Sequence, residues 1–377
     1  MGPAILVDKS IFQSLSKDEI QYLRKYYNIV FCPTLFYEIL GDLKKYDNEE
    51  LSKKEVNKVA YKIHGPNAYF TTDFRTLILA ELLGNNIDMN RKPILTGGRE
   101  IDIGKGKKGI FFEEQPEFIA LRRWLEGKYS EAEKLYATNW RNCIDATDLN
   151  IAKINAKYFR KTKSLKELKE YIPVIIEDQN NQFELLQFLL KIIGSDINIR
   201  NKVCERWLAS NMPKIKDFAL YAYYCLSVYM NFYVGIAQNH LGTRASNVID
   251  LEYVLYLPFC KVFTSSDIFL MSFSKEFLAE EQDFVWGFDL KKDLQSICEY
   301  WSGKSDEQRK QYRKKYGNYP PEIQDSVTCK LWKKHFGERN ESFGETELTP
   351  ERGKQLMETI KPILDSLKDD GNLGTPS

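Results

Sequence analysis

Residues 246–269 read SNVIDLEYVLYLPFCKVFTSSDIF and predict three elements in succession. Apolar residues at helical spacing indicate an amphipathic helix, Pro258 indicates a tight turn, and the apolar run after it indicates a short strand. Asp250 lies early on the helix, and Asp267 lies just beyond the carboxyl end of the strand. Because sites in open α/β sheets form at the carboxyl ends of strands, Asp267 is the more suggestive of the two acids.

The first 45 residues show the strand–helix repeat of an α/β fold. Ala4–Val7 is a continuous apolar run, typical of a strand buried on both faces, and it ends in Asp8. The tetrapeptide Ser16–Glu19 matches a capping box and predicts the start of a helix. A second apolar run, Ile29–Cys32, is followed by helical spacing that contains Glu38. This order of elements predicts a parallel sheet flanked by helices.

Asp8 and Glu38 occupy related positions in this repeat. If the two strands are parallel neighbours, both acids face the same edge of the sheet. Taken singly, each acid is typical of a solvated surface. Their shared position beyond strand ends favours a common site.

From about residue 49 to residue 240, helical spacing replaces the strand pattern, and no repeat of fixed period indicates a solenoid. The predicted helices cover 50–63, 73–83, 115–126, 130–157, 164–170, 182–193, 199–209 and 215–239. Further on, Phe284–Phe288 predicts a last strand. Helices are expected over 291–301, 306–315 and 350–367, before a short polar end that we expect to be disordered.

A glycine-rich basic segment, 97–112, interrupts the helical pattern. It contains Lys105, Lys107 and Lys108 but lacks the order of a phosphate-binding loop, because no Ser or Thr follows Lys107 or Lys108. Two interpretations are open. The segment is either a solvated loop or hairpin, or a flexible basic finger that grips phosphates.

The overall composition limits which classes of protein this chain could belong to. A net charge of +1 does not indicate a general nucleic-acid binder, although it leaves a local basic patch open. The aromatic share of 13% suits either a bulky helical core or base-stacking surfaces. No secretory signal is visible, and no apolar run approaches the roughly 20 residues that a membrane span needs.

Cysteine and histidine usage argues against disulfides, zinc and a His-rich metal site. The seven cysteines are an odd number without a CxxC pair, and the chain has only three histidines. Scattered cysteines in apolar surroundings fit buried free thiols in a reducing cytoplasm.

Four acids remain as the chemical core of the sequence: Asp8, Glu38, Asp250 and Asp267. Carboxylates are hard oxygen ligands suited to Mg²⁺ or Mn²⁺. Several carboxylates that converge on one point repel one another unless a cation holds them. With such a metal they can activate water and stabilise a leaving oxygen in phosphodiester cleavage. No GxSxG or HExxH motif and no Cys/His arrangement offers comparable chemistry.

Four short motifs around these acids resemble those of PIN-domain nucleases. Ile5–Ser10 is similar to the opening strand of that family, and Pro33–Leu40 is similar to its second motif. Asn247–Leu257 resembles the third motif, and Val262–Phe269 resembles the closing strand with its [ST]-x-D. The 17 positions from Asp250 to Asp267 suit a helix–turn–strand unit.

The resemblance implies a parallel sheet and an endoribonuclease whose four acids bind Mg²⁺ or Mn²⁺ directly or through water. It implies that Ser10 and Ser265 orient these ligands or a metal-bound water. Asn247 lies one turn before Asp250, and it either assists the site or merely begins the helix. The candidates for contacts to substrate phosphates are Lys9, Arg244, Lys105, Lys107 and Lys108.

The chain departs from the compact family in the 212 positions between Glu38 and Asp250. We therefore expect a core in two halves, 1–48 and 240–290, a helical insertion over 49–239 and a helical extension over 291–377. The insertion is expected to cover the site, recognise substrate or mediate contacts with another copy or a protein partner. Two alternatives stay open: a non-catalytic scaffold that binds nucleic acid or protein, and a nuclease directed at DNA.

Overall fold

The computed structural model describes residues 2–65, 69–94, 98–102, 108–112, 114–340, 354 and 357–358, without the side chains of 98–102, 108–112 and 154–158. The chain forms two compact units, Met1–Cys298 and Glu299–Ser377. The four predicted acids all belong to the first unit. The expected boundary of the extension, residue 291, falls inside the helix α15 (Gly287–Ser302).

The first unit is built on a four-stranded parallel sheet, as predicted. The strands lie in the order β2 (Asn28–Val30), β1 (Ala4–Val7), β5 (Val262–Ser265) and β6 (Asp283–Trp286). Each neighbouring pair is parallel. The side chains of Ile5, Leu6 and Val7 are fully buried, which explains why this strand reads as a continuous apolar run.

Strand register brings two distant stretches of sequence to one place. Val7 of β1 lies opposite Thr264 of β5, so the next residues, Asp8 and Ser265, are neighbours across the strands. Since the strands are parallel, their carboxyl ends share one edge of the sheet. This edge joins the beginning of the chain to a stretch more than 250 positions later.

The helices around the sheet begin where local chemistry predicts. Ser16 and Glu19 form the expected capping box of α2 (Lys17–Tyr26). Pro33 is the first residue of α3 (Pro33–Gly41), where proline is well tolerated. The remaining core helices are α1 (Lys9–Ser14), α13 (Asn247–Val254) and α14 (Ile268–Lys275). The turn at Pro258 is a short 3-10 helix, η4 (Leu257–Phe259).

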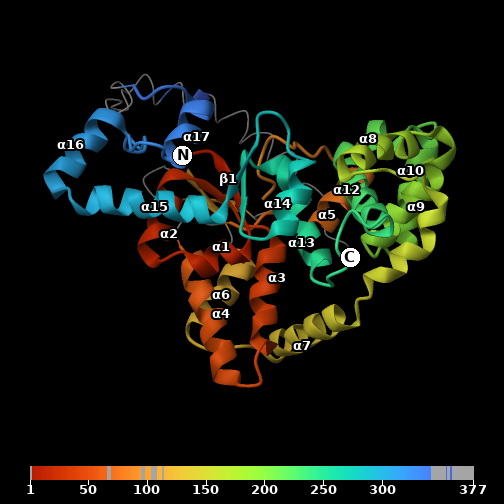
Figure 1. Ribbon diagram of the computed structural model, residues 1–377, viewed down its shortest axis with the longest axis horizontal. Helices are drawn as coiled ribbons and strands as arrows, with labels where there is room; N and C mark the ends of the chain where they lie inside the picture. The colour runs from red at the N-terminus through yellow and green to blue at the C-terminus, as the bar shows by residue number, and fades with distance from the viewer. Residues whose placement is uncertain are drawn as a thin grey trace. The chain divides into compact units, whose positions relative to one another are not determined.

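The segment between α3 and α13 is mainly helical, as expected. Its main helices are α4 (Glu49–Ile63), α5 (Phe74–Leu82), α6 (Pro116–Leu125), α7 (Glu131–Ala146), α8 (Leu165–Ile176), α9 (Gln182–Ile192), α10 (Ile197–Ala209), α11 (Ile215–Phe218) and α12 (Leu220–Ala237). The buried α12 contacts α5, α8, α9 and α13, so it connects the insertion to the core (Figure 1).

Two predicted helices were too long. The helix expected over 130–157 ends at Ala146, and a 3-10 segment, η2 (Leu149–Tyr158), follows it. The helix expected over 215–239 breaks at Ala219, whose backbone is extended. The new helix starts there because the carboxylate of Glu81 accepts the backbone N–H groups of Tyr221 (3.1 Å) and Ala222 (2.8 Å). A carboxylate at this position satisfies amides that have no partner within the helix.

The glycine-rich segment contains an antiparallel hairpin of β3 (Gly98–Asp102) and β4 (Lys108–Phe112). This observation agrees with the hairpin interpretation. Lys105 and Lys107 lie outside the described residues, and the side chain of Lys108 is likewise not described. The interpretation as a phosphate-gripping finger stays a prediction.

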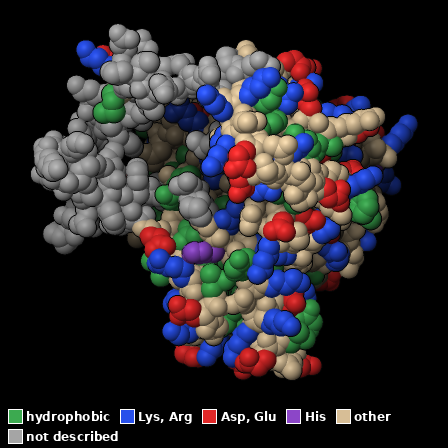
Figure 2. All heavy atoms as spheres, turned by 90° about the vertical axis from the view of Figure 1, so that its left-hand side faces the viewer, with side chains coloured by type: hydrophobic (Ala, Val, Ile, Leu, Met, Phe, Trp, Pro, Cys, Tyr) green, Lys and Arg blue, Asp and Glu red, His purple; other side chains and the backbone are tan. Residues whose placement is uncertain are grey.

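The surface carries charges of both signs. On the face drawn in Figure 2, Lys and Arg side chains are interspersed with Asp and Glu side chains, as the net charge of +1 leads one to expect. None of the seven cysteines, all of which the structure describes, forms a disulfide bond. Among the helices of the described residues, none combines the length and the apolar character that crossing a membrane requires.

The second unit contains α16 (Asp306–Tyr316) and α17 (Val327–Phe336). A capping box of Ser305 and Gln308 begins α16, where a helix was predicted. The helix α17 was not predicted. The helix expected over 350–367 falls largely outside the described residues.

Candidate functional site

Asp8 lies at the carboxyl end of β1, and its two oxygens have different partners. Oδ1 accepts the backbone N–H of Ile11 (3.2 Å) and so caps α1. Oδ2 accepts the hydroxyl of Ser265 from β5 (2.7 Å), and the Ser10 hydroxyl contacts both oxygens at 2.8 and 3.0 Å. One oxygen therefore serves the helix, and the other is held by hydroxyls at the sheet edge.

Asp267 lies at the equivalent place after β5. Its Oδ1 caps α14 by accepting the N–H groups of Phe269 (2.7 Å) and Leu270 (3.2 Å). The Ser265 hydroxyl accepts the N–H of Asp267 (2.9 Å) while it donates to Asp8. Ser265 thus links the two strand ends through a single oxygen.

Glu38 projects from α3 toward the same edge. The hydroxyl of Tyr253 on α13 donates to its Oε2 (2.5 Å). The ammonium of Lys9 lies 3.8 Å from its Oε1 and 3.2 Å from Oδ1 of Asp42. Lys9 is mostly buried, so it neutralises these acids and does not extend into solvent.

Asp250 on α13 completes the group. The guanidinium of Arg244 lies 3.0 Å from Oδ2 of Asp250 and 3.1 Å from Oδ2 of Asp267. It therefore bridges two of the predicted ligands. The Arg244 side chain is 60% exposed, so its position at the surface permits movement.

Burial and mutual repulsion raise the pKa values of two of these acids, Asp8 and Asp250. Burial raises the pKa of Asp8 to about 7, the hydroxyls of Ser265 and Ser10 oppose that rise, and the charge of Glu38 adds to it. Burial also raises the pKa of Asp250 to about 8, with further increases from Glu38 and Asp267 that Arg244 partly offsets. Because Glu38 acts on both aspartates, the acids form one electrostatic group.

The structure brings together all four predicted acids with Ser10, Ser265, Lys9 and Arg244. The side-chain amide of Asn247 donates to the carbonyl of Gly242 (3.1 Å), and the residue is buried at the start of α13. This position agrees with the interpretation of Asn247 as a residue that begins the helix.

Two contacts of the site, and one further ion pair of α13, were not predicted. Tyr253 lies three residues after Asp250, so helical spacing was an available signal for it. Asp42, which holds both Lys9 and Arg141, follows Glu38 by one turn. Glu252 accepts the Thr34 hydroxyl (3.0 Å) and pairs with Arg75 (2.8 Å), and no sequence signal connects partners so far apart.

The donor set fits a divalent cation in its chemistry. The acids already form ion pairs with basic side chains of the same protein, since Arg244 bridges Asp250 and Asp267 and Lys9 lies near Glu38. Carboxylate oxygens are the ligands that Mg²⁺ and Mn²⁺ prefer. In the described part of the chain, no three His, Cys, Asp or Glu side chains lie close enough together to hold one metal ion. Binding of a metal by three acids would therefore require side-chain movement, beginning with that of Arg244.

Two of the four acids also have a structural explanation, because Asp8 and Asp267 cap helices. Capping accounts for one oxygen of each carboxylate. It does not account for Glu38 and Asp250, which lie within helices and belong to the same electrostatic group.

No protein-family model, curated protein or solved structure matches this chain.

Proposed function

We propose that this chain is a divalent-metal-dependent endoribonuclease with a PIN-like core that hydrolyses RNA phosphodiester bonds. One observation carries the proposal: Asp8, Glu38, Asp250 and Asp267 form one electrostatic group at the carboxyl edge of a parallel sheet. Such an edge is where α/β folds place ligands. Acids gathered at one edge repel one another unless positive charge lies among them, and Lys9 and Arg244 supply such charge here.

Each residue has a part in this proposal. Asp8, Glu38, Asp250 and Asp267 would hold Mg²⁺ or Mn²⁺, which supplies activation of water and stabilisation of the leaving oxygen. Ser10 and Ser265 keep the oxygens of Asp8 in place by hydrogen bonds. Arg244, with its exposed end, would turn from the acids to a substrate phosphate.

The decisive experiment is a cleavage assay on total RNA, transfer RNA and DNA, with Mg²⁺ or Mn²⁺ and with EDTA. We expect metal-dependent cleavage that Asp8→Asn and Asp267→Asn each reduce by about a hundredfold or more, because each removes a charged ligand. Dependence of cleavage on the 2′-hydroxyl separates an RNA-directed enzyme from the DNA-directed alternative.

Asp47→Asn is the matched control, because Asp47 is exposed and lies in the loop after η1 (Asp42–Lys44), away from the strand ends. Its cleavage rate should equal that of the unaltered protein. Undiminished cleavage by a folded, purified Asp267→Asn protein would falsify the assignment. Thermal unfolding of each variant shows whether lost activity reflects lost structure.

A non-catalytic scaffold is the second candidate, and the position of Arg244 favours it. A guanidinium that already pairs with Asp250 and Asp267 satisfies those charges without a metal. Titration with Mg²⁺ and Mn²⁺ by calorimetry distinguishes the candidates. Absence of binding that depends on Asp250 and Asp267 supports the scaffold.

A further inference from the structure

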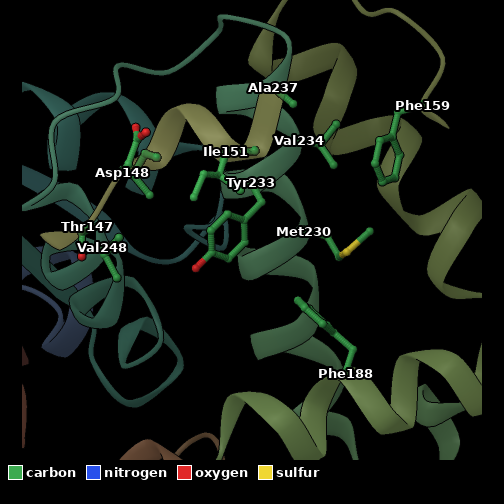
Figure 3. A pocket seen from close by; sticks show the side chains of 12 residues that line it. Thr147, Asp148, Ile151, Phe159, Phe188, Met230, Tyr233, Val234, Ala237 and Val248 are labelled. Atoms are coloured by element: carbon green, nitrogen blue, oxygen red, sulfur yellow. The ribbon is translucent and has the colours of Figure 1, made fainter. Parts of the chain in front are cut away.

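A cavity of about 670 Å³ lies in the helical insertion, apart from the acids. Its walls include Met230 and Tyr233 from α12, Phe188 from α9, Ile151 from η2 and Val248 from α13 (Figure 3). The volume falls within the 300–1,000 Å³ typical of sites for small molecules. Most of the lining side chains are apolar, as in such sites.

Tyr233 gives this cavity a polar group that has no partner among the described residues. Its ring is held by Tyr229, with ring centroids 6.4 Å apart, and by Phe232 at 5.2 Å. In Figure 3 its hydroxyl points toward the side of the cavity formed by Thr147 and Val248. Within the described residues this hydroxyl makes no hydrogen bond to the protein. Because a tyrosine hydroxyl in apolar surroundings usually finds a partner, this one is available to a ligand.

The charge of the lining restricts what can bind. Among the lining residues that the structure describes, Asp148 is the one that carries a charge, and it is exposed. Its Oδ1 accepts the N–H of Asn150 (2.9 Å), which holds the carboxylate in place. A negative charge at this position repels anionic ligands and favours neutral or cationic ones.

We propose that this cavity is a binding site for a neutral or monocationic small molecule that is mainly hydrocarbon or aromatic and carries one hydrogen-bonding group. The apolar body fills the space beside Met230 and Phe188, and the polar group pairs with the Tyr233 hydroxyl. The site does not depend on the proposed nuclease function, because none of its lining residues belongs to the acidic group.

Two fluorescent probes with the same aromatic skeleton test the proposal on the full chain. N-phenyl-naphthylamine is neutral, and anilinonaphthalene sulfonate adds a negative charge. We expect saturable binding of the neutral probe to one site per chain and weaker binding of the sulfonate. Absence of saturable binding of the neutral probe, or equal binding of both probes, overturns the proposal.

Variants then locate the bound probe. Met230→Trp fills the cavity and should weaken binding of the neutral probe about tenfold or more. Leu220→Trp is the matched control, since Leu220 is 48% exposed at the start of the same helix, and it should leave binding unchanged. Tyr233→Phe should weaken binding of the neutral probe by roughly two- to tenfold, because the hydrogen bond between its amine and the Tyr233 hydroxyl is lost. Retention of full affinity by Met230→Trp contradicts the assignment.

Asp148→Asn tests the charge of the site without disturbing the core. The substitution is at an exposed position and keeps an oxygen that can accept the N–H of Asn150. It should strengthen binding of the sulfonate by roughly two- to fivefold, as expected for an exposed charge, and leave the neutral probe unaffected. If Met230→Trp does not fold, the comparison of Asp148→Asn with the unaltered protein is the test of the proposal. An unchanged affinity for the sulfonate then overturns the proposal.

Discussion

The hydroxyl of Ser265 performs two functions with one oxygen, because it donates to Asp8 and accepts the N–H of Asp267. Asp8 also caps α1, so its carboxylate serves structure and site together. Its burial makes the ionised form costly, and this cost connects the acid to the stability of the fold.

We expect the metal-free protein to lose stability as the pH rises from 5 to 8. The pKa of Asp8 is about 7 in the folded protein and near its ordinary value of 3.8 in the unfolded chain. The folded state therefore holds a proton that the unfolded state releases, and this advantage disappears as the pH passes 7. Asp250, with a pKa of about 8, acts in the same direction.

Asp8→Asn should remove part of this dependence. One pKa unit corresponds to about 1.4 kcal/mol, so the fall in unfolding free energy between pH 5 and pH 8 should shrink by on the order of 2 kcal/mol. Urea unfolding in EDTA at both pH values measures the change. Asp47→Asn should show the same pH dependence as the unaltered protein, and an identical dependence in Asp8→Asn contradicts the prediction.

Arg244→Gln should strengthen metal binding, because the guanidinium competes with a metal for Asp250 and Asp267. Arg244 is largely exposed, so we expect a gain of roughly two- to fivefold in affinity for Mg²⁺. Calorimetry at pH 8.5, where most of Asp250 is ionised, measures it. Arg91→Gln, at an arginine that is 79% exposed and pairs with Asp88, is the control. Equal affinities in all three proteins mean that Arg244 does not compete.

At the scale of elements, the position of Glu38 depends on how α3 packs against α7. The Trp140 indole of α7 lies directly against Gly41 at the end of α3: a Cβ at Gly41 would be 2.4 Å from Cδ1 of Trp140. Arg141 adds hydrogen bonds to the carbonyl of Gly41 (3.1 Å) and to Asp42 (2.9 Å). A residue without a side chain is therefore required where the two helices meet.

Gly41→Ala should lower the unfolding free energy by about 1–3 kcal/mol, because the added methyl forces the indole to move. Urea unfolding measures the loss. Gly303→Ala is the control, since a Cβ there meets nothing closer than 3.9 Å. In a Trp140→Ala background, Gly41→Ala should cost almost nothing further. An equal loss in both backgrounds excludes the indole as the cause.

Helices and strands whose ends are set by residues close by in the sequence were predictable. The buried strand β1, the capping box at Ser16 and the proline at the start of α3 each express a rule that acts within a few residues. The end of α7 was also within reach, since Thr147 and Asp148 hydrogen-bond their own backbone neighbourhood. The start of α12 was not, because its cap is Glu81, about 140 positions earlier.

At the scale of the whole molecule, the grouping of the four acids was predictable and their electrostatic partners were not. The rule that sites form at carboxyl ends of parallel strands applies to any chain with this element order. The bridge from Arg244 and the hydrogen bond from Tyr253 to Glu38 depend on side-chain packing. The spacing of apolar residues along the sequence does not indicate how those side chains pack.

The order of the strands in the sheet also determines when the sheet can form during synthesis. β1 is central, yet its partner β5 is made about 250 residues later. At 5–20 residues per second, the ribosome needs roughly 10–50 s to cover that distance. Until then β2 is the one neighbour of β1 in this sheet that has been made, and the other edge of β1 can pair with a wrong strand. A nascent chain of this protein therefore carries an unpaired apolar strand edge while the residues between β1 and β5 are translated, and the acidic group cannot assemble until β5 has left the ribosome.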